Sequence, residues 1–394
     1  MQRTPPTVGA LLAASCFAVS LGCSDAGSAT PAAPADSSVT ADGAVTDAPA
    51  TPDAPAAPPT IPALGNGMHT PASVRVTVVA NDADELDRPR DLAFNPEAPE
   101  QLWILNNGSS SITIVRNAGT AERDSVRNVG RGNTHFMARP SALAFGAPGI
   151  FATSQETDEV TERGAPPDFM GPTLWDSNYD LFDSGDDSHI DMLHNSPNAV
   201  GIAWEADNVY WVIDGAHRCL TRYDFQTPHP RSGTDHRSAN VRRYANGMLT
   251  YTENVSAHAV FDATQGRLYV SEPGANRVAM FDPSAAEMGA RILPNYDGSQ
   301  QRMMGGGTLE TFIDGAANEL RKPSGLALVG DTFYVTDNET SRVVAFDRMG
   351  RRIDWLDLSS EVQPGGLMGI AVDARGWIYL TDAIGNRVIE VAPR

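Results

Sequence analysis

Acidic side chains recur where an aromatic, β-type stretch of the chain ends. Tyr-Val-Ser-Glu272, Tyr-Val-Thr-Asp337 and Tyr-Leu-Thr-Asp382 share this ending, and Asp214 closes a related stretch. If the turns that follow lie on one face, these four carboxylates would surround a channel mouth and could hold a cation such as calcium. An Asp at the end of a strand also accepts hydrogen bonds from the next turn, so a purely structural role is the alternative.

Histidines are the second group of side chains with chemical potential, and the chain has only eight. Five fall in segments that we expect on the same face as these carboxylates: His135, His189, His194, His217 and His258. His229 and His236 fall in a connection that we expect on the opposite face. Imidazoles gathered on one face could bind a metal ion, or they could be ordinary polar side chains of loops.

The elements that must position these side chains form a repeat. Its clearest copy runs from Pro323-Ser-Gly-Leu-Ala through Tyr-Val-Thr-Asp337 to Arg342-Val-Val, and the other copies begin near residues 89, 140, 199, 257 and 367. Each copy has an apolar stretch, a turn, an aromatic stretch, a second turn and a further β stretch, which predicts antiparallel strands joined by hairpins. One copy cannot bury its own faces, whereas six copies arranged radially can.

The two ends of the repeat region predict a closed ring. The last copy stops after its third strand, at residues 391–394. Residues 73–79 precede the first copy and alternate apolar with polar side chains. We therefore expect residues 73–79 to supply the missing fourth strand of the last blade, which removes two exposed sheet edges.

The motifs Pro-Ser-Gly-Leu-Ala, Tyr-Val-Thr-Asp and Asn/Ser-Arg-Val resemble those of the NHL-repeat β-propeller family over roughly residues 73–394. The resemblance implies an all-β, six-bladed propeller of NHL type, closed by an N-terminal strand that completes the last blade. It implies no single function, because propellers serve both as enzymes and as binding platforms.

The repeat also bears a distant resemblance to the propellers of the peptidyl-hydroxyglycine amidating lyases, which bind zinc through histidines at the second repeat position in three blades. Here that position holds His258 in one copy. The other copies carry Arg90, Ser141, Val200, Ser324 and Met368. The resemblance implies a zinc site in which His194, His135 or His217 supply the remaining ligands. A second possible cation site is the run Asp183-Ser-Gly-Asp-Asp-Ser188, whose oxygens could bind calcium.

Composition excludes several classes of function. The 394 residues include 29 Lys and Arg against 49 Asp and Glu, a net charge of −20, which argues against binding nucleic acid or anionic lipid. Three cysteines cannot form a disulfide framework, and we expect Cys219 to be a small buried side chain. The chain has no Gly-x-Ser-x-Gly, phosphate-loop or dinucleotide-binding motif.

The N-terminal segment indicates export. An apolar run at residues 8–21 follows Arg3 and is too short to span a bilayer, so residues 1–22 read as a signal peptide. The Gly22-Cys23 pair resembles a bacterial lipoprotein processing site, which implies lipidation of Cys23; an ordinary cleaved signal is the alternative. Residues 23–70 lack Lys, Arg and aromatic residues, so we expect a disordered tether before a folded body at 71–394.

Two insertions interrupt the repeat. Residues 155–196 add many acidic and aromatic side chains to the second copy, and the Gly- and Met-rich residues 295–311 read as a flexible loop. Long loops on a rigid scaffold commonly carry function, although these could also be decorative. We expect an envelope-anchored platform that binds a protein, peptide, glycan or small molecule. The alternative is a metal-dependent propeller enzyme with its histidines at the channel mouth.

Overall fold

The computed structural model describes residues 60–128, 133–158, 166, 168–182, 189–229 and 233–394. The predicted signal peptide, Cys23 and most of the predicted tether lie outside these residues, as does the Asp183–Ser188 run. No helix in the described residues has the length and apolar character needed to cross a membrane.

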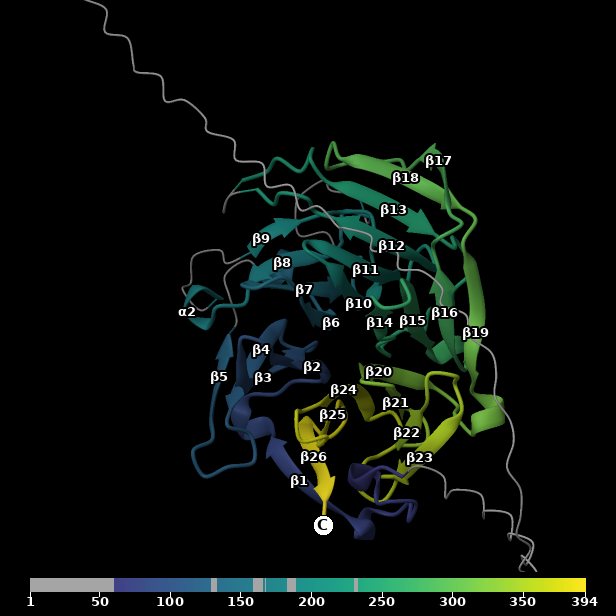
Figure 1. The fold of residues 1–394 in the computed structure, drawn as a ribbon. Coiled ribbons are helices and arrows are strands. Elements are labelled where there is room, and N and C mark those ends of the chain that lie inside the picture. Colours follow the sequence, from purple (N-terminus) through teal and green to yellow (C-terminus); the bar gives the residue numbers. More distant parts are fainter. Residues whose placement is uncertain (1–59, 129–132, 159–165, 167, 183–188, 230–232) are drawn as a thin grey trace, which may run out of the picture. The chain divides into compact units, whose positions relative to one another are not determined.

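Six sheets, each with four core strands, form the blades of the propeller (Figure 1). Blade 1 comprises β2 (Pro89–Asn95), β3 (Ala98–Asn106), β4 (Ser111–Arg116) and β5 (Asp124–Asn128). Blade 2 comprises β6 (Pro140–Phe145), β7 (Ile150–Gln155), β8 (Thr173–Asp176) and β9 (His189–Met192). Blade 3 comprises β10 (Ala199–Ala206), β11 (Val209–Asp214), β12 (Cys219–Asp224) and β13 (Asn240–Tyr244).

The second half of the ring follows the same plan. Blade 4 comprises β14 (Ala259–Asp262), β15 (Arg267–Glu272), β16 (Arg277–Asp282) and β19 (Thr308–Asp314). Blade 5 comprises β20 (Pro323–Val329), β21 (Thr332–Asp337), β22 (Arg342–Phe346) and β23 (Arg352–Asp357). Blade 6 comprises β24 (Leu367–Val372), β25 (Ile378–Asp382), β26 (Arg387–Pro393) and β1 (Val74–Ala80). The short helices are α1 (Asn133–Phe136), α2 (Tyr179–Phe182), η1 (Pro62–Leu64), η2 (Pro71–Ser73), η3 (Asp82–Asp84), η4 (Pro273–Ala275) and η5 (Ala316–Asn318).

The first strand of each blade faces the centre of the ring. Each of these six strands contacts the first strand of the blade before it and of the blade after it, and the sixth contacts the first. A separate cluster of buried apolar side chains fills each of the six interfaces between neighbouring blades. The predicted six-bladed, all-β architecture is confirmed, and the inner strands begin at or within two residues of the predicted repeat starts.

The two ends of the propeller lie in one sheet. Strand β1 pairs antiparallel with β26, in a register that includes Val76 opposite Val391. Figure 1 shows β1 beside the C-terminal strand. The sixth blade therefore combines one strand from before the repeats with three from the last repeat.

The sequence predicts that the folded body begins at residue 71. In the structure, the packed body begins earlier. Helix η1 follows Ile61, and its residues Ala63 and Leu64 are buried in the cluster between blades 5 and 6. The backbone N–H groups of Ile61 and Gly67 both donate to Asp354 in β23, at 2.9 and 3.2 Å. This part of the expected tether is thus held against the outer strand of blade 5.

A hairpin extends blade 3 from the outside. In the sequence, strands β17 (Glu287–Arg291) and β18 (Gln300–Gly305) come between the third and fourth strands of blade 4. In space, β18 pairs parallel with β13 of blade 3. The residues between β17 and β18 reach blade 2, where Asp297 contacts His194. The loop expected at residues 295–311 is therefore largely β-structure, because β13 and β16 offer free edges to pair with.

Candidate functional site

The predicted acidic ring is built into the turns of the blades. Asp214, Glu272, Asp337 and Asp382 are all buried, at 2% exposure or less. Asp337 alone accepts hydrogen bonds from four backbone N–H groups of neighbouring turns. Asp382 accepts from Gly385 N–H and from the guanidinium of Arg387, both at 2.9 Å.

The other two carboxylates, Glu272 and Asp214, also accept hydrogen bonds from nearby turns and side chains. Glu272 accepts from Thr250 N–H at 2.9 Å and from Arg277 at 2.6 Å. Asp214 accepts from His217 through both the backbone N–H and Nδ1, each at 2.8 Å. These contacts support the structural role that the sequence left open, since the carboxylates are directed at turn donors rather than at a shared ion.

The four histidines predicted as metal ligands occupy three separate environments. His135 and His194 come together, with ring centres 6.2 Å apart and Phe169 stacked on His194. His217 bonds to Asp214, and His258 lies with Nδ1 3.5 Å from Asp91. In the part of the chain that the structure describes, these four do not form one group of possible ligands.

The channel mouth instead carries a charged network from three parts of the ring. Arg90, near the start of β2, pairs with Glu156, which follows β7, at 3.1 Å; the two are 2% and 1% exposed. Glu156 also accepts from Tyr251 Oη at 3.2 Å and from Asn254 N–H at 2.6 Å, both in the connection before β14. The Asn254 side-chain oxygen accepts from Arg90 and from Arg139, at 3.4 and 3.3 Å. We call these five residues the channel-mouth network.

Electrostatics at this network favour an anion. Burial lowers the pKa of Arg90, Glu156 opposes this shift, and the positive charges of Arg88 and Arg139 lower it further. Burial and the charge of Glu156 raise the pKa of Tyr251, so its hydroxyl remains a hydrogen-bond donor. Within the described residues no carboxylate forms an ion pair with Arg139, which is partly exposed. An unpaired guanidinium beside a buried ion pair is a ready partner for an oxyanion.

Residues with left-handed backbone conformation also gather at the channel mouth. Arg88 and Arg139 each precede the proline that begins an inner strand, and their φ angles are 50° and 46°. Asn254 is also left-handed, with φ of 62°. Arginine in this region costs on the order of 1 kcal/mol relative to an unstrained backbone, and such strain clusters at ligand sites.

The channel mouth does not fit the three-histidine zinc site that the resemblance implies. The second repeat position contributes one imidazole, His258, while Arg90 occupies the equivalent position of blade 1. A buried guanidinium in the same ring opposes a divalent cation.

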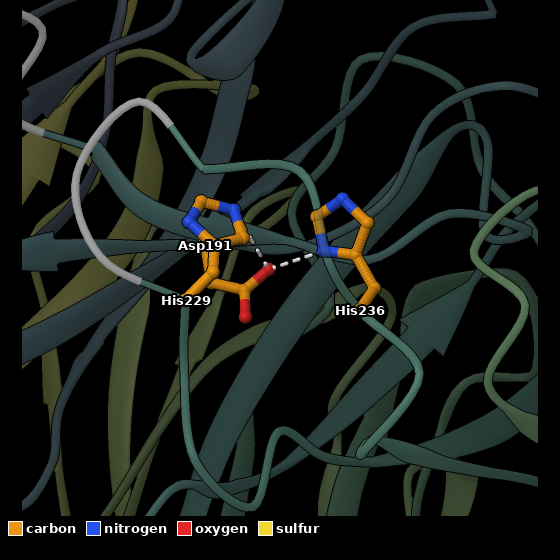
Figure 2. Close-up of side chains that lie close together, drawn as sticks. All are labelled: Asp191, His229 and His236. Atoms are coloured by element: carbon orange, nitrogen blue, oxygen red, sulfur yellow. Dashed lines mark hydrogen bonds and ion pairs between the residues drawn. The ribbon is translucent and has the colours of Figure 1, made fainter.

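A different set of possible ligands lies at the outer edge of blades 2 and 3, and sequence reasoning missed it. Figure 2 shows Asp191 of β9 close to His229 and His236 of the loop from β12 to β13. The sequence gives one hint, since Asp191 belongs to the acidic insertion at residues 155–196. It does not show that this insertion meets a loop of the next blade.

The buried cysteine matches expectation. Cys219 in β12 has no exposed surface. Burial and the nearby charge of Asp214 raise the pKa of its thiol, which disfavours the reactive thiolate.

Comparisons with known proteins agree with this architecture. Residues 320–346, which span β20 to β22, match the NHL repeat family model. An auxiliary nutrient binding protein from Bacteroides ovatus has a similar fold, with 16% identity, 82% of this chain and 76% of that chain covered, and a TM-score of 0.52. An auxiliary nutrient binding protein from Bacteroides thetaiotaomicron is also similar, with 12% identity, 80% of this chain and 76% of that chain covered, and a TM-score of 0.53. No curated protein sequence matches the chain. The fold is thus that of a six-bladed β-propeller containing an NHL repeat.

Proposed function

We propose that this protein is a ligand-binding propeller of the bacterial cell envelope. In this proposal a small solute with a carboxylate or other oxyanion binds at the channel mouth. Arg139 supplies the main positive charge. Arg90, Tyr251 and Asn254 set the orientation of the bound solute. The two similar Bacteroides folds are named auxiliary nutrient binding proteins, a role to which this scaffold is suited.

The observation that carries the proposal is the state of Arg139. Its guanidinium is partly exposed, is held by Asn254, and has no carboxylate ion-pair partner among the described residues. The body of the protein is strongly acidic, with a whole-chain net charge of −20. An arginine without a carboxylate partner among the described residues, at the mouth of an acidic molecule, gives local selectivity for an anion that the overall charge would otherwise repel.

The test is a thermal-shift and calorimetric titration with acetate, citrate and inorganic phosphate as probes. We expect at least one probe to bind saturably, and we expect Arg139→Gln to weaken that binding at least tenfold. The matched control is Arg351→Gln, because Arg351 is an exposed arginine, 79% accessible, in the loop between β22 and β23. Binding confined to an uncharged sugar such as cellobiose, or equal binding by Arg139→Gln, would overturn the proposal.

The envelope location rests on Cys23 and is a separate part of the proposal. If Cys23 carries lipid, Cys23→Ser should move the protein from the membrane fraction to the soluble fraction of the cell. Metabolic labelling with a radioactive fatty acid should mark the parent and not the variant. Cys16→Ser is the control, because it removes the other N-terminal cysteine. Unchanged membrane association of Cys23→Ser would contradict the anchor and leave the ligand site unaffected.

A further inference from the structure

Two blades meet at a buried carboxylate on the outer edge of the ring. Asp191 is 1% exposed and lies in β9, the outermost strand of blade 2. His229, 6% exposed, and His236 come from the long connection between β12 and β13 of blade 3. Figure 2 shows both imidazoles beside the Asp191 carboxylate, with dashed lines from one carboxylate oxygen to a ring nitrogen of each.

The distances suit a metal ion. Asp191 Oδ1 is 2.7 Å from His236 Nδ1 and 3.5 Å from His229 Nε2, and one ligand atom from each residue lies within 4.8 Å of the others. Bond lengths of about 2.0–2.2 Å in a tetrahedral zinc site put ligand atoms about 3.4 Å apart and the centres of two bound imidazoles about 5 Å apart. The rings of His229 and His236 are 5.0 Å apart. The 2.7 Å contact between Asp191 and His236 must lengthen when an ion binds.

A second observation, independent of these three residues, concerns a neighbouring side chain. His194 is 6% exposed, its ring centre lies 6.3 Å from that of His236, and its Nδ1 contacts Asp297 at 2.6 Å. Its other nitrogen, Nε2, is buried and has no hydrogen-bond partner in the described residues. Burying a ring nitrogen with no hydrogen-bond partner costs free energy. Binding of a cation to that nitrogen removes this cost.

The donor set selects the kind of metal. Two imidazole nitrogens and one carboxylate oxygen form a ligand set typical of zinc, whereas calcium and magnesium prefer oxygen ligands alone. In the described residues no other three histidine, cysteine or acidic side chains approach one another in this way.

We propose that Asp191, His229 and His236 bind one zinc-class divalent ion, with the ring of His194 next to that of His236. The ion ties the outer strand of blade 2 to the long loop of blade 3. The site is distinct from the channel-mouth network, and it does not depend on the proposed ligand.

The experiment uses the untagged full chain, stripped with EDTA and titrated calorimetrically with zinc ions alone. We expect one ion per chain, and at least hundredfold weaker binding in His229→Gln, His236→Gln and Asp191→Asn. His217→Gln and His258→Gln are matched controls that should bind as the parent does. Cobalt in place of zinc should give the visible absorption of a four-coordinate ion in the parent and controls only.

Melting curves in EDTA separate loss of ligands from loss of fold. Each variant compared must melt within a few degrees of the stripped parent. If Asp191→Asn does not fold, the two histidine variants decide, because their side chains belong to a connecting loop. Absence of stoichiometric zinc, or zinc binding by the histidine variants equal to that of the parent, would overturn the proposal.

Discussion

At the scale of single residues, Glu156 holds the channel mouth together. Its two oxygens receive Arg90, Tyr251 and the backbone of Asn254, and it is 1% exposed. Glu156 lies at the start of the insertion at residues 155–196 that follows the second repeat copy, and its partners come from other parts of the ring. The acidic turn residues were found from their spacing, whereas this network required the folded ring to bring residues 90, 156 and 254 together.

Replacing Glu156 by Gln should destabilise the protein by about 3–5 kcal/mol, because Arg90 is left buried with no opposite charge. Urea unfolding measures this free energy directly. Glu122→Gln, at an exposed carboxylate, serves as the control and should change stability by less than about 0.5 kcal/mol. Equal unfolding midpoints for the two variants would mean that the Arg90–Glu156 pair contributes nothing.

At the scale of elements, the inner strands approach closely because glycine occupies the third repeat position in three blades. A Cβ atom at Gly325 would lie 2.1 Å from the backbone oxygen of Met368 in the next blade, and one at Gly201 would lie 1.9 Å from that of Ala257. The repeat therefore predicts both the strands and their packing. The hairpin β17–β18 has no counterpart in other blades, so its pairing with β13 was not predictable from the repeat.

Gly325→Ala should destabilise the ring by about 1–3 kcal/mol, since two neighbouring inner strands must move apart. The control is Gly305→Ala, because a Cβ at Gly305 meets no atom within 4 Å. Chemical denaturation of both variants should give a loss only for Gly325→Ala. A Gly325→Ala protein as stable as the control would show that inner-strand packing is looser than these distances imply.

At the scale of the whole molecule, closure of the ring brings residues of different blades together at both candidate sites. The channel-mouth network joins blades 1 and 2 to the connection between blades 3 and 4, and the site of Asp191, His229 and His236 joins blades 2 and 3. Sequence reasoning found the six blades and the two strands that meet at the chain ends. It separated His194 from His236 onto different faces, because loop lengths do not reveal how far an insertion reaches across a neighbouring blade.

The pairing of β1 with β26 is the contact on which this account depends most. Arg75 lies opposite Ala392 in the register of the two strands, and opposite residues of an antiparallel pair have Cα atoms about 4.5–5.5 Å apart. That separation suits a disulfide bond. The double variant R75C/A392C, with Cys16→Ser and Cys23→Ser, should therefore cross-link in the folded state. The control V78C/A392C has mismatched positions and should keep its thiols free.

The decisive measurement is a count of free thiols in native R75C/A392C after mild oxidation, followed by urea unfolding with and without reductant. We expect loss of both introduced thiols and a reductant-sensitive gain of about 2–4 kcal/mol in the free energy of unfolding. Free thiols in folded R75C/A392C, or equal cross-linking of V78C/A392C, would contradict closure of the ring by β1.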